Sequence, residues 1–313
     1  MTITPAGASL STNEGARAWA RKLGSVGVWS IDVERLAAAD ARAYAQELEQ
    51  LGAPVVWIQE SLGSKEVFAH AGLLLAATER LIVATGIANI WARDPVAMAN
   101  GQRTLEDAYP GRFLLGLGVS HAPVIEVRGL GARWERPLEH MRTYLDAMDK
   151  APYTGRSVET PRVLAALGPK MLQLAADRTL GAHPYFVPVE HTTAARKTLG
   201  SGPVLAVEQA AVLATDPATA RATARRHMKR YLDLDNYTNN LRRLGWGDAD
   251  IANGGSDALV DALVAWGDTA AIRKRVDDHL ARGADHVAIQ VIRVDLKAPA
   301  TEEWQKLAPS LLR

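Results

Sequence analysis

Short apolar runs alternate with amphipathic segments along the chain, and this alternation limits the possible folds more than any other feature. The runs are rich in Val, Ile, Leu and Ala and are apolar at successive positions, which is typical of parallel strands buried on both faces. The run 204–214 is also Ala-rich, so its composition fits a helix as well. We expect strands at 26–30, 54–59, 81–88, 113–119, 162–167, 183–187, 204–214 and 286–292.

Helical patterns fill the intervals between these runs. The segment 216–230 opens with Asp216-Pro217, a capping residue followed by Pro at the first helical position, and 269–282 ends before Gly283. The remaining periodic segments show the spacing of apolar side chains expected of a helix face. We expect helices at 37–51, 69–78, 95–109, 133–148, 169–178, 216–230 and 269–282.

Eight strands alternating with helices in 313 residues predict an α/β fold, a (β/α)8 TIM barrel, with a doubly wound open sheet as the alternative. The segment 232–266 exceeds the simple repeat and reads as a helix, a loop and a second helix, so we expect an insertion late in the barrel. No stretch rich in Pro, Gly and Ser divides the chain. A single domain over 1–313 is therefore expected.

Composition narrows the possible functions. The absence of cysteine excludes disulfides, thiolate nucleophiles and Cys-type metal sites, and the scattered histidines predict no metal site. A net charge of +1 suggests neither nucleic acid nor an anionic membrane as a partner. The beginning of the chain has no apolar run typical of a signal peptide, so a cytoplasmic protein is expected.

Polar side chains follow several of the expected strands. In a TIM barrel the carboxyl ends of the strands form the active site, so these residues are candidates for function: Glu60, Asn89, Ser120 and His121. Each has a simpler alternative. Glu60 could cap a helix or form a surface ion pair, Asn89 could stabilise an Asx-turn, and His121 could be an exposed loop residue.

The junction Gly168-Pro169-Lys170 leads from an expected strand directly into an expected helix. A helix that starts this way presents free backbone N–H groups, which bind anions. His191 and Thr192, after the next strand, could add an imidazole and a hydroxyl donor for the same anion. The alternatives are a solvated Lys170 and ordinary capping by Thr192.

Four segments together resemble the luciferase-like monooxygenase superfamily, and in particular its branch that depends on the deazaflavin coenzyme F420. They are IVATGIANIWARDP at 82–95, LEDAYPGRFLLGLGVS at 105–120, RVLAALGPKM at 162–171 and GAHPYFVPVEHT at 181–192. The resemblance implies a barrel with a late insertion, a homodimer, and a cofactor across the carboxyl-terminal mouth. It also implies a cis peptide between Gly86 and Ile87 behind the cofactor ring, and a tail phosphate bound at Gly168, Pro169, Lys170, His191 and Thr192.

The resemblance further implies hydride transfer between F420 and a small organic substrate. Glu60 and His121 would handle the substrate proton, while Asn89 and Ser120 would hold the ring or the substrate. In the sugar-phosphate-oxidising type the two catalytic positions carry His and Glu in the opposite order, which argues against that reaction here. Two alternatives stay open: an FMN-dependent monooxygenase of the same superfamily, and a non-catalytic deazaflavin-binding protein.

Overall fold

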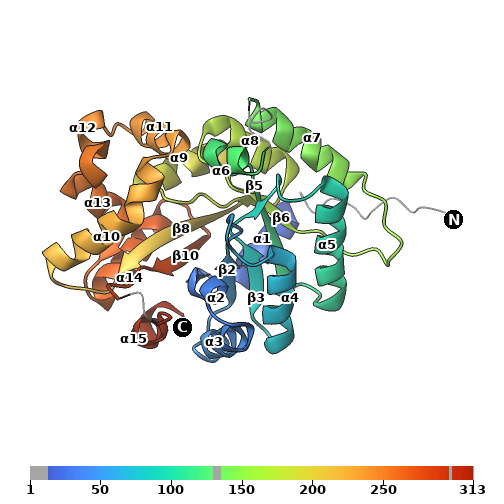
Figure 1. Ribbon diagram of the computed structural model, residues 1–313, viewed down its shortest axis with the longest axis horizontal. Helices are drawn as coiled ribbons and strands as arrows, with labels where there is room; N and C mark the ends of the chain where they lie inside the picture. Colours follow the sequence, from blue (N-terminus) through green and yellow to red (C-terminus); the bar gives the residue numbers. More distant parts are fainter. Residues whose placement is uncertain (1–12, 130–134, 296–297, 313) are drawn as a thin grey trace.

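Eight parallel strands close into a barrel in the computed structural model, which describes residues 13–129, 135–295 and 298–312 (Figure 1). The last barrel strand pairs with the first, with Val287 opposite Val26, and also with the preceding barrel strand, with His286 opposite Ala206. The prediction of a TIM barrel is confirmed, and the open-sheet alternative is wrong because the sheet has no free edge at this point. The barrel strands are β1 (Val26–Trp29), β2 (Val55–Ile58), β3 (Ile82–Thr85), β5 (Phe113–Gly118), β6 (Arg162–Leu164), β7 (Gly181–Ala182), β8 (Val204–Val212) and β10 (His286–Val291).

Helices surround this barrel, and several begin where the sequence predicts. Asp94, Asp216 and Asp268 each accept a hydrogen bond from a backbone N–H of the first turn that follows them. The helices are α1 (Asn13–Leu23), α2 (Asp32–Arg35), α3 (Ala38–Gln50), α4 (Val67–Ala77), α5 (Pro95–Ala108), α6 (Ala122–Val127), α7 (Pro137–Asp149), α8 (Pro169–Arg178), α9 (Val189–Leu199), α10 (Pro217–Leu232), α11 (Asp235–Arg243), α12 (Asp248–Ile251), α13 (Asp257–Leu263), α14 (Thr269–Ala281) and α15 (Thr301–Leu311). None of the described helices is long and apolar enough to cross a bilayer.

The late insertion forms a lobe beside the barrel, drawn in yellow and orange in Figure 1. Its helices α11, α12 and α13 pack with α10 around Tyr231, Tyr237 and Leu241. The expected helix does not reach residue 266, because Val264–Trp266 form strand β9, in which Val264 lies opposite Ala210 of β8. The insertion is therefore tied to the end of a barrel strand by backbone hydrogen bonds.

Some expected elements differ from the structure. Strand β7 covers Gly181–Ala182 and not 183–187, because Pro184 has no N–H to donate to a sheet ladder. Residues 81–88 divide into β3 and the short strand β4 (Ala88–Asn89). His191 and Thr192 lie in helix α9 and not in a loop. Of the helix expected at 133–148, residues 133 and 134 lie outside the described residues.

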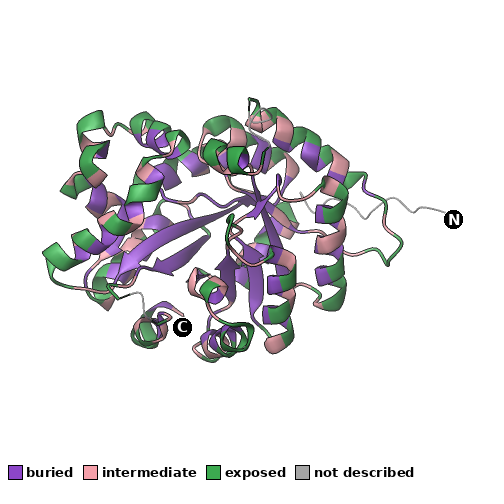
Figure 2. Ribbon diagram, viewed as in Figure 1, coloured by how far each residue is buried: buried purple, intermediate pink, exposed green. Residues whose placement is uncertain are grey.

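The barrel strands are buried (Figure 2), and large buried side chains such as Trp29, Trp57 and Leu114 make the barrel a packed core rather than a pore. Trp57 is completely buried and stacks on His183 with a centroid separation of 4.1 Å. The Trp57 indole N–H also donates to Nε2 of His286 at 3.1 Å. Trp29 lies near the carboxyl-terminal end of the same core and contacts Tyr185.

Gly116 in β5 allows a close approach between two barrel strands. A Cβ on Gly116 would lie 2.0 Å from the carbonyl oxygen of Thr85, and its backbone groups bond the Thr85 hydroxyl. We expect Gly116→Ala to lower the free energy of unfolding by about 1–3 kcal/mol or more, because the two strands would have to move apart. Urea unfolding measures this loss.

The matched control is Gly63→Ala, because a Cβ on Gly63 would meet no atom within 4 Å. Equal unfolding midpoints for the two variants would contradict the packing argument.

Candidate functional site

The polar residues predicted from the sequence gather at the carboxyl-terminal end of the barrel. Glu60 follows β2, Asn89 ends β4, and Ser120 and His121 follow β5. The Gly168 junction follows β6. Because all barrel strands are parallel, these segments open onto the same mouth.

The Gly86–Ile87 peptide is cis, as the resemblance implies, and it lies directly after β3. Its neighbours hold it from one side: the Gly86 N–H donates to the Ile58 carbonyl at 2.7 Å, and the Glu60 N–H donates to the Ile87 carbonyl at 3.1 Å. Gly86 also requires glycine, since a Cβ would lie 2.6 Å from Nε1 of Trp29. The segment is thus fixed against the centre of the barrel.

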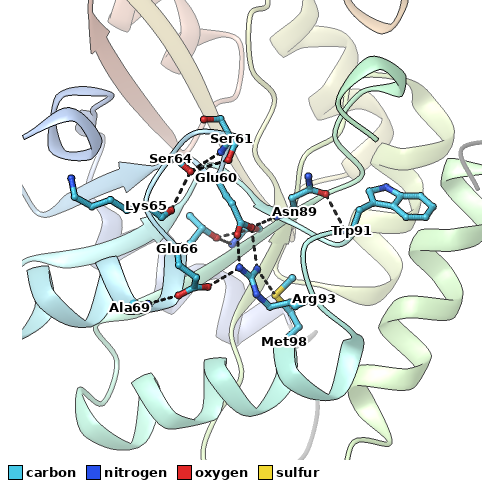
Figure 3. Close-up of polar contacts among 12 residues, drawn as sticks. Glu60, Ser61, Ser64, Lys65, Glu66, Ala69, Asn89, Trp91, Arg93 and Met98 are labelled. Atoms are coloured by element: carbon cyan, nitrogen blue, oxygen red, sulfur yellow. Dashed lines mark hydrogen bonds and ion pairs between the residues drawn. The ribbon is translucent and has the colours of Figure 1, made fainter. Parts of the chain in front are cut away.

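Glu60 anchors the end of β2 to the segment after β4 (Figure 3). Its carboxylate accepts hydrogen bonds from the backbone N–H of Asn89 at 2.7 Å and from Nη1 of Arg93 at 3.0 Å, and a second Arg93 nitrogen contacts the other oxygen. Arg93 also pairs with Glu66 at 2.7 Å. The Glu60 side chain is only 6% exposed, so its charge is neutralised inside the protein by Arg93.

Arg93 was not among the residues predicted from the sequence. The only local signal is its place before the Asp94-Pro95 cap of α5, and that signal does not reveal its partner. Both carboxylate oxygens of Glu60 take part in these contacts. A role in proton transfer would require the ion pair to open.

Asn89, Ser120 and His121 have different environments. Asn89 is buried, and its Oδ1 accepts from the Trp91 N–H at 3.0 Å, which is the Asx-turn contact. Ser120 has a φ of 60°, in the left-handed region. His121 is half-buried, and its Nδ1 lies 3.1 Å from Oδ1 of Asn236 in the insertion.

Burial lowers the pKa of His121, so the neutral ring is favoured. With Nδ1–H donated to the Asn236 side-chain oxygen, Nε2 is left as a proton acceptor. Asn236 thus orients His121. The sequence around Asn236, in the insertion, contains no pattern that predicts its contact with His121.

The start of α8 has the features of an anion site. Gly168 precedes the helix, Pro169 occupies its first turn, and Lys170 is exposed. Arg243 of the insertion lies beside this start, since a Cβ on Gly168 would be 3.6 Å from its Nη2. Arg243 bonds Oδ1 of Asn240 at 3.1 Å, and no carboxylate of the described residues pairs with it.

His191 and Thr192 contribute differently to this region. Nε2 of His191 lies 2.9 Å from the Leu167 carbonyl, while its buried Nδ1 has no hydrogen-bond partner in the part of the chain that the structure describes. Thr192 is fully buried, and its hydroxyl lies 2.7 Å from Nδ1 of His279. The predicted donor role of Thr192 is therefore corrected: its hydroxyl is buried against His279 of α14 and is not accessible to an anion.

Three buried polar atoms of the barrel core have no hydrogen-bond partner among the described residues, and two of them, on Trp29 and His183, border Gly86. The three atoms are Nε1 of Trp29, Nε2 of His183 and Oε1 of Glu208. Buried polar atoms are usually hydrogen-bonded, so these atoms leave donors or acceptors unsatisfied inside the core. The features that fit a cofactor with a phosphate tail are the start of α8 and Arg243 beside it. The described residues hold no group of three His, Asp or Glu side chains suited to a metal ion.

Glu208 is a charged residue type inside the apolar strand β8, and the sequence analysis did not single it out. One carboxyl oxygen accepts from the Phe186 N–H at 3.0 Å. Burial raises its pKa to about 8. The carboxyl is therefore largely protonated at neutral pH and can donate a hydrogen bond.

Glu208 also makes stability depend on pH. An unfolded Glu has a pKa of about 4.3, so the native state retains a proton that the unfolded state releases. The stabilisation is complete below about pH 4 and is lost as pH rises through about 8. Relative to Glu208→Gln, we expect the wild type to lose up to about 1.4 kcal/mol of unfolding free energy per pH unit between about pH 5 and pH 8.

Urea unfolding of both proteins across this range measures the difference. The control is Glu79→Gln, since the Glu79 side chain is 88% exposed. A difference between wild type and Glu208→Gln that stays constant with pH would contradict the protonated carboxyl.

Comparisons with known proteins show which family the chain belongs to. A 5,10-methylenetetrahydromethanopterin reductase of Methanolobus tindarius is 26% identical over 185 residues, which are 51% of this chain and 56% of that protein. The chain spans about half the length of the curated relatives it matches.

Two solved structures share the fold. An F420-dependent secondary alcohol dehydrogenase in complex with an F420-acetone adduct has a TM-score of 0.70 and 15% identity, over 93% of this chain and 99% of that one. The oxygenating constituent of the 3,6-diketocamphane monooxygenase from Pseudomonas putida, in complex with FMN, has a TM-score of 0.66 and 15% identity, over 93% and 98%. Residues 23–286 match the luciferase-like monooxygenases. The chain therefore belongs to the luciferase-like monooxygenase family, a family of oxidoreductases.

Proposed function

We propose that this enzyme transfers a hydride between coenzyme F420 and a small organic substrate. The observation that carries the proposal is Arg243, a guanidinium without a carboxylate partner among the described residues, placed beside the start of α8. A helix start and an arginine together favour a phosphate. F420 carries such a phosphate, and the alcohol dehydrogenase of the same fold is named for F420.

An FMN-dependent monooxygenase is the second candidate, because FMN also carries a phosphate and a neighbour of the same fold binds FMN. A deazaflavin, when bound, accepts or donates a hydride at a ring carbon and activates oxygen poorly. The protein supplies binding, orientation and proton transfer. The cofactor ring would lie against Gly86, Ile87, Asn89 and Ser120. Its phosphate tail would lie against Gly168, Pro169, Lys170 and His191.

His121 and Glu60 have distinct proposed roles in proton transfer. His121 would accept or return the substrate proton at Nε2, because Asn236 holds its Nδ1 and burial keeps the ring neutral. Glu60 would act as a proton carrier only when its pair with Arg93 opens, and otherwise it positions the segment around Asn89. We also propose a cytoplasmic homodimer, which analytical ultracentrifugation and cell fractionation would test.

Titration of the purified protein with oxidised F420 and separately with FMN, followed by fluorescence, tests the cofactor. We expect F420 to bind more tightly, and Arg243→Gln to weaken its binding about tenfold or more, since a hydrogen bond to a charged group contributes about 1.5–3 kcal/mol. The control is Arg242→Gln, which removes a charge from the same helix at a residue paired with Asp248. We expect it to change the affinity less than about twofold.

Preference for FMN would replace the F420 proposal by the monooxygenase. Equal effects of the two arginine variants would remove Arg243 from the cofactor site.

Turnover assays across a panel of alcohols, ketones and enones separate the proton-transfer roles. We expect His121→Ala to retain F420 affinity and to lose about 10²–10⁴-fold in kcat, the usual contribution of general acid–base catalysis. We expect Glu60→Gln, which keeps an acceptor oxygen but loses the charge, to lower the melting temperature and to have only a small effect on kcat. A protein that binds F420 and turns over none of these substrates, with affinity unaffected by both variants, would support a non-catalytic binding protein instead.

A further inference from the structure

A cationic cavity lies in the mouth of the barrel, on the side of β1 and β10. Its volume is about 160 Å³, below the roughly 300–1,000 Å³ of pockets for drug-sized ligands. It is bordered by residues that follow β1, by the end of β10 and by one face of α10. None of these residues was singled out by the sequence.

Four arginines line this cavity, against one carboxylate. They are Arg35, Arg226, Arg230 and Arg293, and the carboxylate belongs to Asp32. Such an excess of guanidinium groups around a small cavity favours an anion, because arginine binds carboxylate and phosphate groups through paired N–H donors.

The arginines have few acidic partners of their own. Arg226 donates to the carbonyl oxygens of Arg293 and Val294, at 2.8 and 3.2 Å. Arg293 pairs with Glu303 at 3.1 Å. Arg35 is exposed and makes no hydrogen bond to a described residue. Most of the positive charge therefore remains available to a ligand.

Asp32 and His227 complete the polar lining. The Asp32 carboxylate accepts from the Ala300 N–H at 3.0 Å, and burial raises its pKa, which weakens it as a counter-ion. Nε2 of His227 is buried without a partner among the described residues, and burial lowers the pKa of this ring to about 3. The neutral imidazole can thus give a directed hydrogen bond.

A chain of hydrogen bonds connects the cavity to the centre of the barrel. Arg230 contacts the Tyr231 hydroxyl, which lies 2.7 Å from the Tyr185 hydroxyl. Tyr185 donates to Gln290, a lining residue, at 2.8 Å, and its ring lies 5.2 Å from that of Trp29, which borders Gly86. An anion in the cavity would therefore be connected through Tyr185 to the residues that border Gly86.

We propose that this cavity binds the anionic group, a carboxylate or a phosphate, of the substrate, so that the enzyme acts on small organic acids or phosphate esters. The inference rests on the proposed function, because it assigns the cavity to the substrate of that reaction. The F420 tail also carries anionic groups, and the experiment separates these two sources. The start of α8 with Arg243, on the β6 side of the mouth, is the place assigned to the tail.

Isothermal titration calorimetry with inorganic phosphate and with succinate, on protein saturated with F420, tests the proposal. We expect both anions to bind, and the double variant Arg35→Gln/Arg226→Gln to weaken them at least about tenfold. The control is Lys229→Gln, which removes one exposed charge from α10 outside the cavity. We expect it to change anion affinity less than about twofold, and the double variant to leave F420 affinity unchanged.

Three results would overturn the inference: equal anion affinities of the double variant and the wild type, competition between the anions and F420, or weaker F420 binding in the double variant. The last two would assign the cavity to the cofactor tail. The same titrations on protein without cofactor keep the two proposals separate. Anion binding that the double variant loses would support the anion site even if F420 did not bind, while F420 binding without anion binding would leave only the cofactor proposal.

Discussion

The pairing of β10 with both β1 and β8 is the constraint on which the rest of the structure depends. This pairing closes the sheet, so every barrel strand has hydrogen-bonded neighbours on both sides. It also places segments far apart in the sequence on one rim, because all strands run in the same direction. Residues after β1 and β10 thus line one cavity together, although about 260 residues separate them.

The barrel core and its mouth contain polar groups in three distinct states. Glu60 and Arg93 neutralise each other, which makes their segments rigid. Glu208 stays neutral, since burial raises its pKa. Arg243 and the arginines around the cavity keep charge that no described carboxylate fully compensates. The first state stabilises the scaffold, whereas the other two are costly for the folded chain alone and are typical of binding sites.

The insertion and the helix before it contribute several of the polar groups around the mouth. Asn236 orients His121, Arg243 lies beside α8, and α10 supplies Arg226 and Arg230. Strand β9 fixes this lobe to β8. Residues of this segment are thus brought to the mouth by the way the lobe packs against the barrel.

The sequence by itself determined the barrel, most strand and helix positions, and the junction at Gly168. Continuous apolar runs, Asp-Pro caps and a Gly-Pro helix start are local patterns, and local patterns can be read from the chain. Only the tertiary structure decided the partners of side chains. Glu60 meets Arg93 across 33 positions, Thr192 meets His279 across 87, and Arg243 reaches Gly168 from the insertion. No local pattern encodes these contacts, because they depend on how closed strands and packed helices bring distant segments together.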